Sequence, residues 1–232
     1  MSFITENVLT ARRRIAEAAA ASGRDPAAIR LLAATKMNGP EAIREAVAAG
    51  VDACAENRVQ EFLEKNAVNA YAGCDVHFIG HLQRNKVKYL VGAVSLIHSV
   101  DSVELLRAVD RRAAALSVTQ DVLLEVNIGG EASKSGAAPE DLRALLSEAE
   151  SCSGVRVLGL MTIPPVESQK GENLNYFRRM YDLFVDIRQK KYNNVLMSEL
   201  SMGMSSDYED AVRCGATIVR LGTALFGPRN YN

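Results

Sequence analysis

Cysteine and histidine are scarce in this chain, and tryptophan is absent. The 232 residues include only three histidines and four cysteines. No two cysteines form a C-x-x-C pair, and no set of cysteines and histidines has the spacing of zinc ligands. The sequence therefore predicts no metal site and no disulfide framework. We expect the thiols to be reduced, in or near the core of a cytoplasmic protein. They are Cys54, Cys74, Cys152 and Cys214.

Long apolar runs and an excess of one charge are missing too. No run approaches the roughly 18 apolar residues that a membrane-spanning helix needs. The 27 basic and 28 acidic residues leave a formal net charge of −1, so no basic excess favours nucleic acid or an anionic membrane. The N-terminus mixes Glu6 with the arginines of 12–14 and does not resemble a signal peptide. We therefore expect a soluble protein with no membrane and no nucleic-acid partner.

Short apolar runs alternate with amphipathic segments along the chain. Many of the runs are rich in Val, Ile and Leu without strict alternation, which is typical of strands covered on both faces. The predicted strands are 30–36, 52–56, 75–79, 95–100, 121–127, 155–160, 195–201 and 217–221. Eight strand–helix repeats in about 230 residues predict an α/β fold, a single (β/α)₈ barrel of the TIM type with an extra N-terminal helix.

Helical patterns and start signals support this interpretation. Apolar residues at i, i+3, i+4 and i+7 occur at Leu142, Leu145, Leu146 and Ala149 and again at Phe177, Met180, Tyr181 and Phe184. Two possible capping boxes are Asp101 with Glu104 and Ser206 with Glu209. An open doubly wound sheet is the main rival, but no Gly-x-Gly-x-x-Gly follows the first strand. The barrel uses nearly all of the length, which predicts one domain over residues 1–232.

Lys36 is the most informative residue, because it ends the apolar run 31–36. A lysine at the carboxyl end of a buried strand is costly to bury as an ammonium, and burial lowers the pKa of an amine. A neutral amine can attack an aldehyde. The alternative is a lysine that marks the strand end and reaches solvent.

The ends of the last two predicted strands favour an anion. Ser205 and Ser206 precede a helical segment at 207–214, and Gly222 and Thr223 follow the eighth strand. In barrels of this type the loops after strands seven and eight often bind phosphate with backbone N–H groups. Alternatively, Ser206 only caps a helix and Gly222 only makes a turn. A lysine nucleophile and a phosphate site together suggest pyridoxal 5′-phosphate, which has both an aldehyde and a phosphate. Another phosphorylated metabolite, with Lys36 as a plain ion-pair partner, stays open.

The same stretches resemble the pyridoxal phosphate homeostasis protein family, from about residue 30 to the end. The matching segments are 34–36, 56–61, 77–86, 126–136, 159–164 and 200–229. The resemblance implies a barrel like the N-terminal domain of alanine racemase (PLP fold type III), without the second domain. It implies a carrier in vitamin B6 and amino-acid homeostasis that holds the cofactor reversibly as a Schiff base.

The resemblance also assigns roles to residues. Lys36 would carry the cofactor, and Ser205, Gly222 and Thr223 would hold its phosphate, with Ser201 as an additional ligand. Arg220 would lie beside the pyridine nitrogen. Two further residues, Asn57 and Met202, would line the surroundings of the ring.

Arg220 favours a carrier over an enzyme. A guanidinium is always cationic and can only donate, so it leaves the pyridine nitrogen unprotonated and the ring a poorer electron sink. Racemases of this barrel type tolerate that arrangement and add a second acid/base residue, a tyrosine from another domain or subunit. Here Tyr231 is the only loose candidate. We therefore predict no catalytic activity, with a PLP-dependent amino-acid racemase or decarboxylase as the alternative. PLP, and PLP-dependent enzymes in their apo form, are the expected partners of a monomer.

Two other side chains are placed near the expected barrel mouth. His81 follows Gly80 at a strand end and either touches the site or lies beside it. Lys134, in the segment 133–136, could hold the cofactor temporarily during transfer. His77 and His98 lie in or next to apolar strands, where a hydrogen-bonded core histidine is the expected role.

Overall fold

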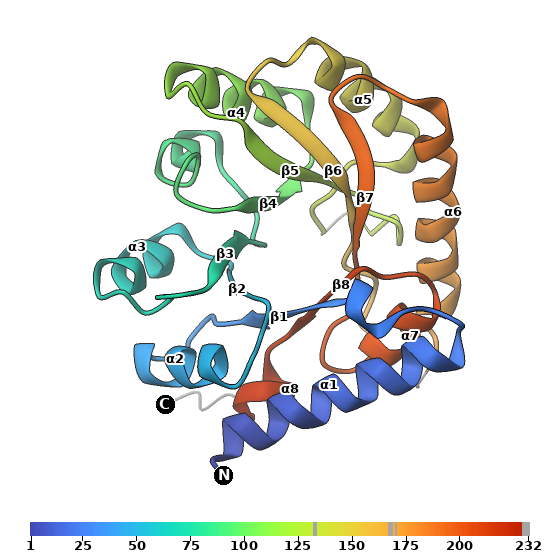
Figure 1. The fold of residues 1–232 in the computed structure, drawn as a ribbon. Coiled ribbons are helices and arrows are strands. Elements are labelled where there is room, and N and C mark those ends of the chain that lie inside the picture. Colours follow the sequence, from blue (N-terminus) through green and yellow to red (C-terminus); the bar gives the residue numbers. More distant parts are fainter. Residues whose placement is uncertain (132–133, 167–168, 170, 229–232) are drawn as a thin grey trace.

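Eight parallel strands form the centre of the molecule. The computed structural model describes residues 1–131, 134–166, 169 and 171–228. Each strand pairs with the next along the chain, and β8 closes on β1 (Figure 1). The strands are β1 (Arg30–Ala34), β2 (Ala53–Glu56), β3 (Asp75–Phe78), β4 (Leu96–Val100), β5 (Gln120–Glu125), β6 (Val155–Met161), β7 (Val195–Ser201) and β8 (Ile218–Leu221). The predicted closed barrel is confirmed.

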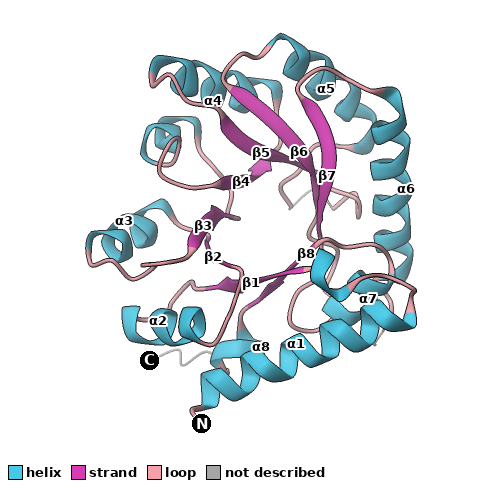
Figure 2. Ribbon diagram, viewed as in Figure 1, coloured by secondary structure: helices cyan, strands magenta, loops and turns pink. Residues whose placement is uncertain are grey.

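Helices surround the strands on the outside of the barrel (Figure 2). They are α1 (Phe3–Ala21), α2 (Pro40–Ala48), α3 (Val59–Ala67), α4 (Val103–Ala115), α5 (Leu142–Ser151), α6 (Leu174–Lys190), α7 (Tyr208–Arg213) and α8 (Thr223–Phe226). Short 3₁₀ helices cover Pro26–Ala28, Arg84–Tyr89 and Pro139–Asp141.

The connection from β3 to β4 differs from the predicted alternation, because its helix is the 3₁₀ helix Arg84–Tyr89. The buried Val87 lies three residues before the buried Leu90. A spacing of three matches the period of a 3₁₀ helix, in which side chains at i and i+3 stack on one side.

The strands are apolar on both faces because the barrel has two cores. Inside the barrel, a small core packs Leu32, Ala53, Ala55, Leu96, Leu123, Met161 and Ile218. Between barrel and helices lies a larger core, to which β1 contributes Leu31 and Ala33. Successive strand residues point to opposite faces, so one run serves both cores. The apolar pattern of α6 is borne out by buried Phe177, Met180 and Phe184, whereas Tyr181 is exposed.

The extra N-terminal helix is confirmed as α1. Its apolar face includes Val8, Ala11 and Ile15, all buried, and the helix packs along α7 and α8 (Figure 1). Ser2 caps it by accepting a hydrogen bond from the N–H of Thr5 at 3.3 Å. Among the helices in the described ranges, none is both long enough and apolar enough to cross a membrane.

Both predicted capping boxes are wrong by one residue. Helix α4 begins after Ser102, whose hydroxyl accepts from the N–H of Leu105, and not after Asp101. Helix α7 begins after Asp207 and not after Ser206. Asp207 makes no side-chain capping bond to the helix; its Oδ1 accepts from the N–H of Met204, before the helix, at 2.7 Å. At α4 the neighbouring Ser102 takes the capping position in place of Asp101.

Candidate functional site

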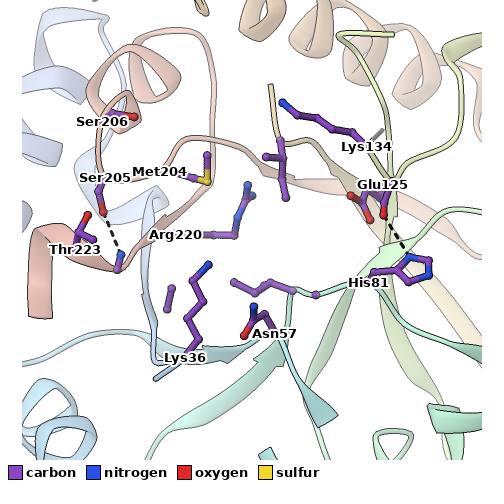
Figure 3. A pocket seen from close by; sticks show the side chains of 16 residues that line it. Lys36, Asn57, His81, Glu125, Lys134, Met204, Ser205, Ser206, Arg220 and Thr223 are labelled. Carbon is purple, nitrogen blue, oxygen red and sulfur yellow. Dashed lines mark hydrogen bonds between the residues drawn. The ribbon is translucent and has the colours of Figure 1, made fainter. Parts of the chain in front are cut away.

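A cavity opens at the carboxyl ends of the strands. Its volume of about 470 Å³ suits a small molecule. Six of the eight residues predicted to bind a cofactor line it, namely Lys36, Asn57, Ser205, Arg220, Gly222 and Thr223 (Figure 3). They come from the ends of β1, β2 and β8 and from the loop after β7. This is the usual place for the site in a (β/α)₈ barrel.

Lys36 lies in the turn that leaves β1. The strand ends at Ala34, two residues earlier than predicted, and the N–H of Thr35 still bonds to the carbonyl of Ala55 at 2.9 Å. The Lys36 side chain extends into the cavity from this turn (Figure 3). The strand therefore fixes the base of the lysine, and the turn aims its amine at the cavity.

Hydroxyl groups and backbone N–H groups gather at one end of the cavity. The Ser205 hydroxyl accepts a hydrogen bond from the N–H of Gly222 at 3.1 Å (Figure 3). It accepts another from the N–H of Ala224, also at 3.1 Å. Ser206 and Thr223 also line the cavity here. Donors of this kind, in a cavity that also contains the Lys36 amine and the cationic Arg220, suit a phosphate.

Arg220 reaches the cavity from inside the barrel and is only 4% exposed. Its guanidinium donates to Ser201 Oγ at 2.6 Å and to the carbonyl of Thr162 at 2.9 Å. Burial lowers the pKa of Arg220 to about 10, against the opposing charges of Glu125 and Asp207. The guanidinium therefore stays cationic at neutral pH and has a fixed orientation.

Ser201 is placed differently from its predicted role. It is buried on β7 and is absent from the cavity lining; it holds Arg220 and contacts His98 Nδ1 at 3.0 Å. His98 Nε2 in turn lies 2.9 Å from His77 Nδ1. Burial lowers the pKa of His77 to about 3 and that of His98 well below its ordinary value, so both rings are neutral. Both histidines are thus buried and hydrogen-bonded, in agreement with the core role that the sequence predicts for them.

Met202 also departs from its predicted position. It is fully buried in the outer core, whereas Met204, two residues later, lines the cavity. Residues 202 and 204 follow the end of β7, where the backbone turns into the loop before α7. The sequence alone does not show which of the two methionines faces inward after a strand has ended.

Asn57 adds a polar atom that lacks a partner. Its Oδ1 is buried and makes no hydrogen bond within the described residues, although Asn57 lines the cavity. Gly80 lets the β3 loop approach here, because a Cβ at that position would lie 2.0 Å from the Asn57 carbonyl oxygen. Because this oxygen is shielded, the contact of Asn57 with the cavity is made by its other atoms.

Glu125 is a site residue that the sequence did not single out as a ligand group. It ends β5, is 5% exposed and lines the cavity. Burial and the charge of Asp101 raise the pKa of Glu125 to about 7, despite the opposing effect of Arg220. The signal available beforehand was only its position at a strand end. Its carboxyl group is a second acid/base group in the same cavity as Lys36.

His81 and Lys134 lie at the mouth of the cavity, as predicted. His81 Nδ1 is 3.3 Å from Ser135 Oγ and 3.6 Å from Asp101 Oδ2. Lys134 donates to the carbonyl of Pro164 at 2.9 Å and pairs with Glu131 at 2.6 Å. Tyr231 lies outside the described residues. Within the described ranges, no tyrosine lines the cavity, and no cluster of three or more potential metal ligands occurs.

Comparisons with known proteins agree with this fold. Residues 7–230 match the family model for the alanine racemase N-terminal domain. Pyridoxal phosphate homeostasis proteins from Aquifex aeolicus (47% identical; 94% of this chain, 95% of the relative) and Pseudomonas aeruginosa (42%; 100% and 98%) are similar over their lengths. The solved structure of PipY from Synechococcus elongatus with PLP bound matches with a TM-score of 0.80 and 37% identity, covering 92% of this chain and 100% of that one.

Proposed function

Because the chain belongs to the pyridoxal phosphate homeostasis proteins, within the alanine racemase N-terminal domain family, we propose that it binds pyridoxal 5′-phosphate reversibly. It would thereby take part in vitamin B6 and amino-acid homeostasis inside the cell. PipY, a relative with 37% identity, has been solved with PLP bound. The observation that carries the proposal is the cavity where Lys36 and the hydroxyl-rich loops after β7 and β8 meet.

The residues present fit this cofactor. When bound, pyridoxal 5′-phosphate supplies an aldehyde carbon with which a lysine amine reacts reversibly. Lys36 provides that amine. Ser205, Gly222 and Thr223 would hold the phosphate, and Asn57 lines the same cavity.

Arg220 supports a carrier role. The guanidinium is held by Ser201 and Thr162 and remains charged at neutral pH. A fixed cation offers only donors to a ring nitrogen and does not favour its protonation. The chain thus supplies an amine for the covalent bond and leaves the ring a poorer electron sink.

Because of Glu125, a racemase-type activity is the second candidate function. Two-base proton transfer needs a second acid/base group, and this carboxyl lines the cavity together with Lys36. A pKa near 7 is suited to proton transfer at neutral pH. We propose that the carrier role is the main one, because the relatives are named for homeostasis.

Proton exchange separates the two candidates. The protein loaded with PLP is mixed with amino acids in heavy water, and loss of the α-proton signal is followed by NMR. Exchange no faster than with free PLP supports the carrier. Exchange that needs both Lys36 and Glu125, and is lost in Lys36→Ala and Glu125→Gln, would establish a working proton-transfer site.

The cellular location, the oligomeric state and the partners of the protein are proposals too. We infer that the protein works in the cytoplasm as a monomer and passes PLP to apo forms of PLP-dependent enzymes. Equilibrium ultracentrifugation tests the oligomeric state, and recovery of activity in an apo enzyme separated by a dialysis membrane, compared with direct mixing, tests direct transfer.

A further inference from the structure

The turn that carries Lys36 contains a strained residue. Met37, directly after the lysine, has a φ of +63°, in the left-handed region that non-glycine residues rarely adopt. Its side chain is 56% exposed, so packing does not hold it there. Within the turn, the N–H of Asn38 bonds to the Thr35 carbonyl at 3.1 Å. A conformation of this kind persists only where the surroundings enforce it.

An ion cluster on the far side of the turn holds the residues on both sides of Lys36. The N–H of Met37 donates to Glu61 Oε2 at 2.9 Å. Lys65 Nζ donates to the carbonyl of Thr35 at 2.9 Å and also to Glu61 Oε2 at 3.1 Å. Helix α3, which carries both Glu61 and Lys65, is thus tied to both neighbours of the cofactor lysine.

The cluster is anchored in the core by Glu56. This carboxylate is fully buried and accepts from Lys65 at 2.7 Å, from the Thr35 hydroxyl at 2.5 Å and from the Tyr71 hydroxyl at 3.0 Å. The three donors of the Lys65 ammonium are therefore all used, by two carboxylates and one carbonyl. All three of these bonds to Glu56 are made by Oε1, and within the described residues its buried Oε2 has no hydrogen-bond partner. Displacing Lys65 would leave the buried Glu56 carboxylate without its cation, so the cluster resists movement.

Glu61 is held in its charged form. Burial alone would raise its pKa, but the N–H of Met37 and the ammonium of Lys65 outweigh burial and leave the pKa of Glu61 below its ordinary value. Glu56, Glu61 and Lys65 are all absent from the cavity lining. Any effect they have on a ligand must pass through the turn.

We propose that Lys65 and Glu61, anchored by Glu56, are positioning residues for Lys36. They fix the turn on both sides of the lysine and so direct its amine toward the place where an aldehyde carbon is bound. The inference rests on the proposed function, since it concerns covalent attachment at Lys36. Small displacements of a nucleophile have large effects on bond formation.

The test compares two ligands that differ at one carbon. Pyridoxal 5′-phosphate can bond to Lys36, whereas pyridoxine 5′-phosphate has the same ring and phosphate and an alcohol in place of the aldehyde. In Glu61→Ala we expect affinity for pyridoxal 5′-phosphate to fall roughly tenfold, the loss that one charge-assisted hydrogen bond represents, and affinity for pyridoxine 5′-phosphate to change less than about twofold. Lys65→Met should show the same selectivity.

Controls come from the same helix. Glu64 is exposed on α3, and Glu64→Ala should leave both affinities unchanged. Glu61→Gln keeps an oxygen for the N–H of Met37 and should recover most of the lost affinity. Lys65→Met leaves Glu56 buried without its cation, so Glu61→Ala is the decisive variant if the Lys65 variant does not fold. In the cofactor-free Glu61→Ala protein, the amide of Met37 should exchange faster with heavy water.

Equal weakening of both ligands would assign the cluster a merely structural role and overturn the proposal, as would unchanged affinity for pyridoxal 5′-phosphate. Failure of the proposed function has a different signature. In that case borohydride treatment of the wild-type protein with pyridoxal 5′-phosphate would leave Lys36 unmodified, whatever residue stands at 61.

Discussion

Replacing Glu125 with glutamine should change how the stability of the cofactor-free protein depends on pH. The carboxyl group is 5% exposed, and its pKa is raised from an ordinary value of 4.5 to about 7 by burial and by Asp101, against Arg220. Lys36, Lys134 and His81 face the same cavity. Between these two pKa values the folded state holds more protons at Glu125 than the unfolded state does.

The direction in which stability changes with pH follows from this excess of bound protons. The stability that protonated Glu125 contributes is fully present below pH 4.5, is lost as the pH rises toward 7 and is absent above that. A shift of this size corresponds to about 3 kcal/mol. Glutamine has a similar volume and no titration. The free energy of unfolding of Glu125→Gln, relative to wild type, should therefore rise by about 3 kcal/mol between pH 4.5 and pH 8.

Urea unfolding followed by circular dichroism, at half-unit steps of pH, measures this difference. The titrations of the other groups are shared by both proteins and largely cancel in the comparison. Glu140→Gln, at an exposed position, controls for the change in net charge. If the difference between wild type and Glu125→Gln stays constant over this pH range, Glu125 is not buried as a carboxyl group at the cavity.

Three further predictions concern other parts of the barrel. Gly159→Ala should lower the free energy of unfolding in urea by more than about 3 kcal/mol, because its Cβ would lie 1.7 Å from the carbonyl oxygen of Glu199. Gly39→Ala, where a Cβ would have no atom within 4 Å, should not have this effect, and equal losses in the two variants would contradict the prediction. His77→Gln should make the protein less sensitive to acid. Because the pKa of His77 is lowered to about 3 in the folded state, this histidine lowers the free energy of unfolding of the wild type by about 1.4 kcal/mol for each pH unit below 6.5. Urea midpoints of the two proteins that run parallel from pH 7 to 5 would contradict this prediction. Ser205→Ala should weaken pyridoxal 5′-phosphate and inorganic phosphate alike by roughly tenfold in equilibrium dialysis, since its hydroxyl organises the N–H groups of the loop after β8; an effect on only one of them would count against a phosphate site.

The barrel could be predicted because its signals are local. Each strand is a short apolar run, and the inner and outer cores both require apolar residues, so the runs are dense and easy to find. Lys36 was identifiable for the same reason, as a charge at the end of such a run. The 3₁₀ helix after β3 was not, because Val87 and Leu90 fit the i, i+3 spacing of either helix type.

The supporting network of the site could not be predicted because its members are far apart in the sequence. His98 and Ser201 are separated by 103 residues, and Arg220 reaches Thr162 across 58. Their meeting depends on which side chains point into the barrel, and that follows from strand register rather than from any local pattern. Ser201 shows the consequence: it was expected at the phosphate and instead holds Arg220.

The most direct test of the account is to find where the cofactor is attached. The wild-type protein is incubated with pyridoxal 5′-phosphate, one half is reduced with borohydride and digested for mass spectrometry, and the other half is dialysed. We predict a reduced pyridoxyl phosphate group on Lys36, its loss in Lys36→Ala, and full recovery of cofactor-free protein from the dialysed half. A label spread over surface lysines with Lys36 unmodified, or a Lys36 adduct that dialysis cannot remove, would contradict a reversible carrier.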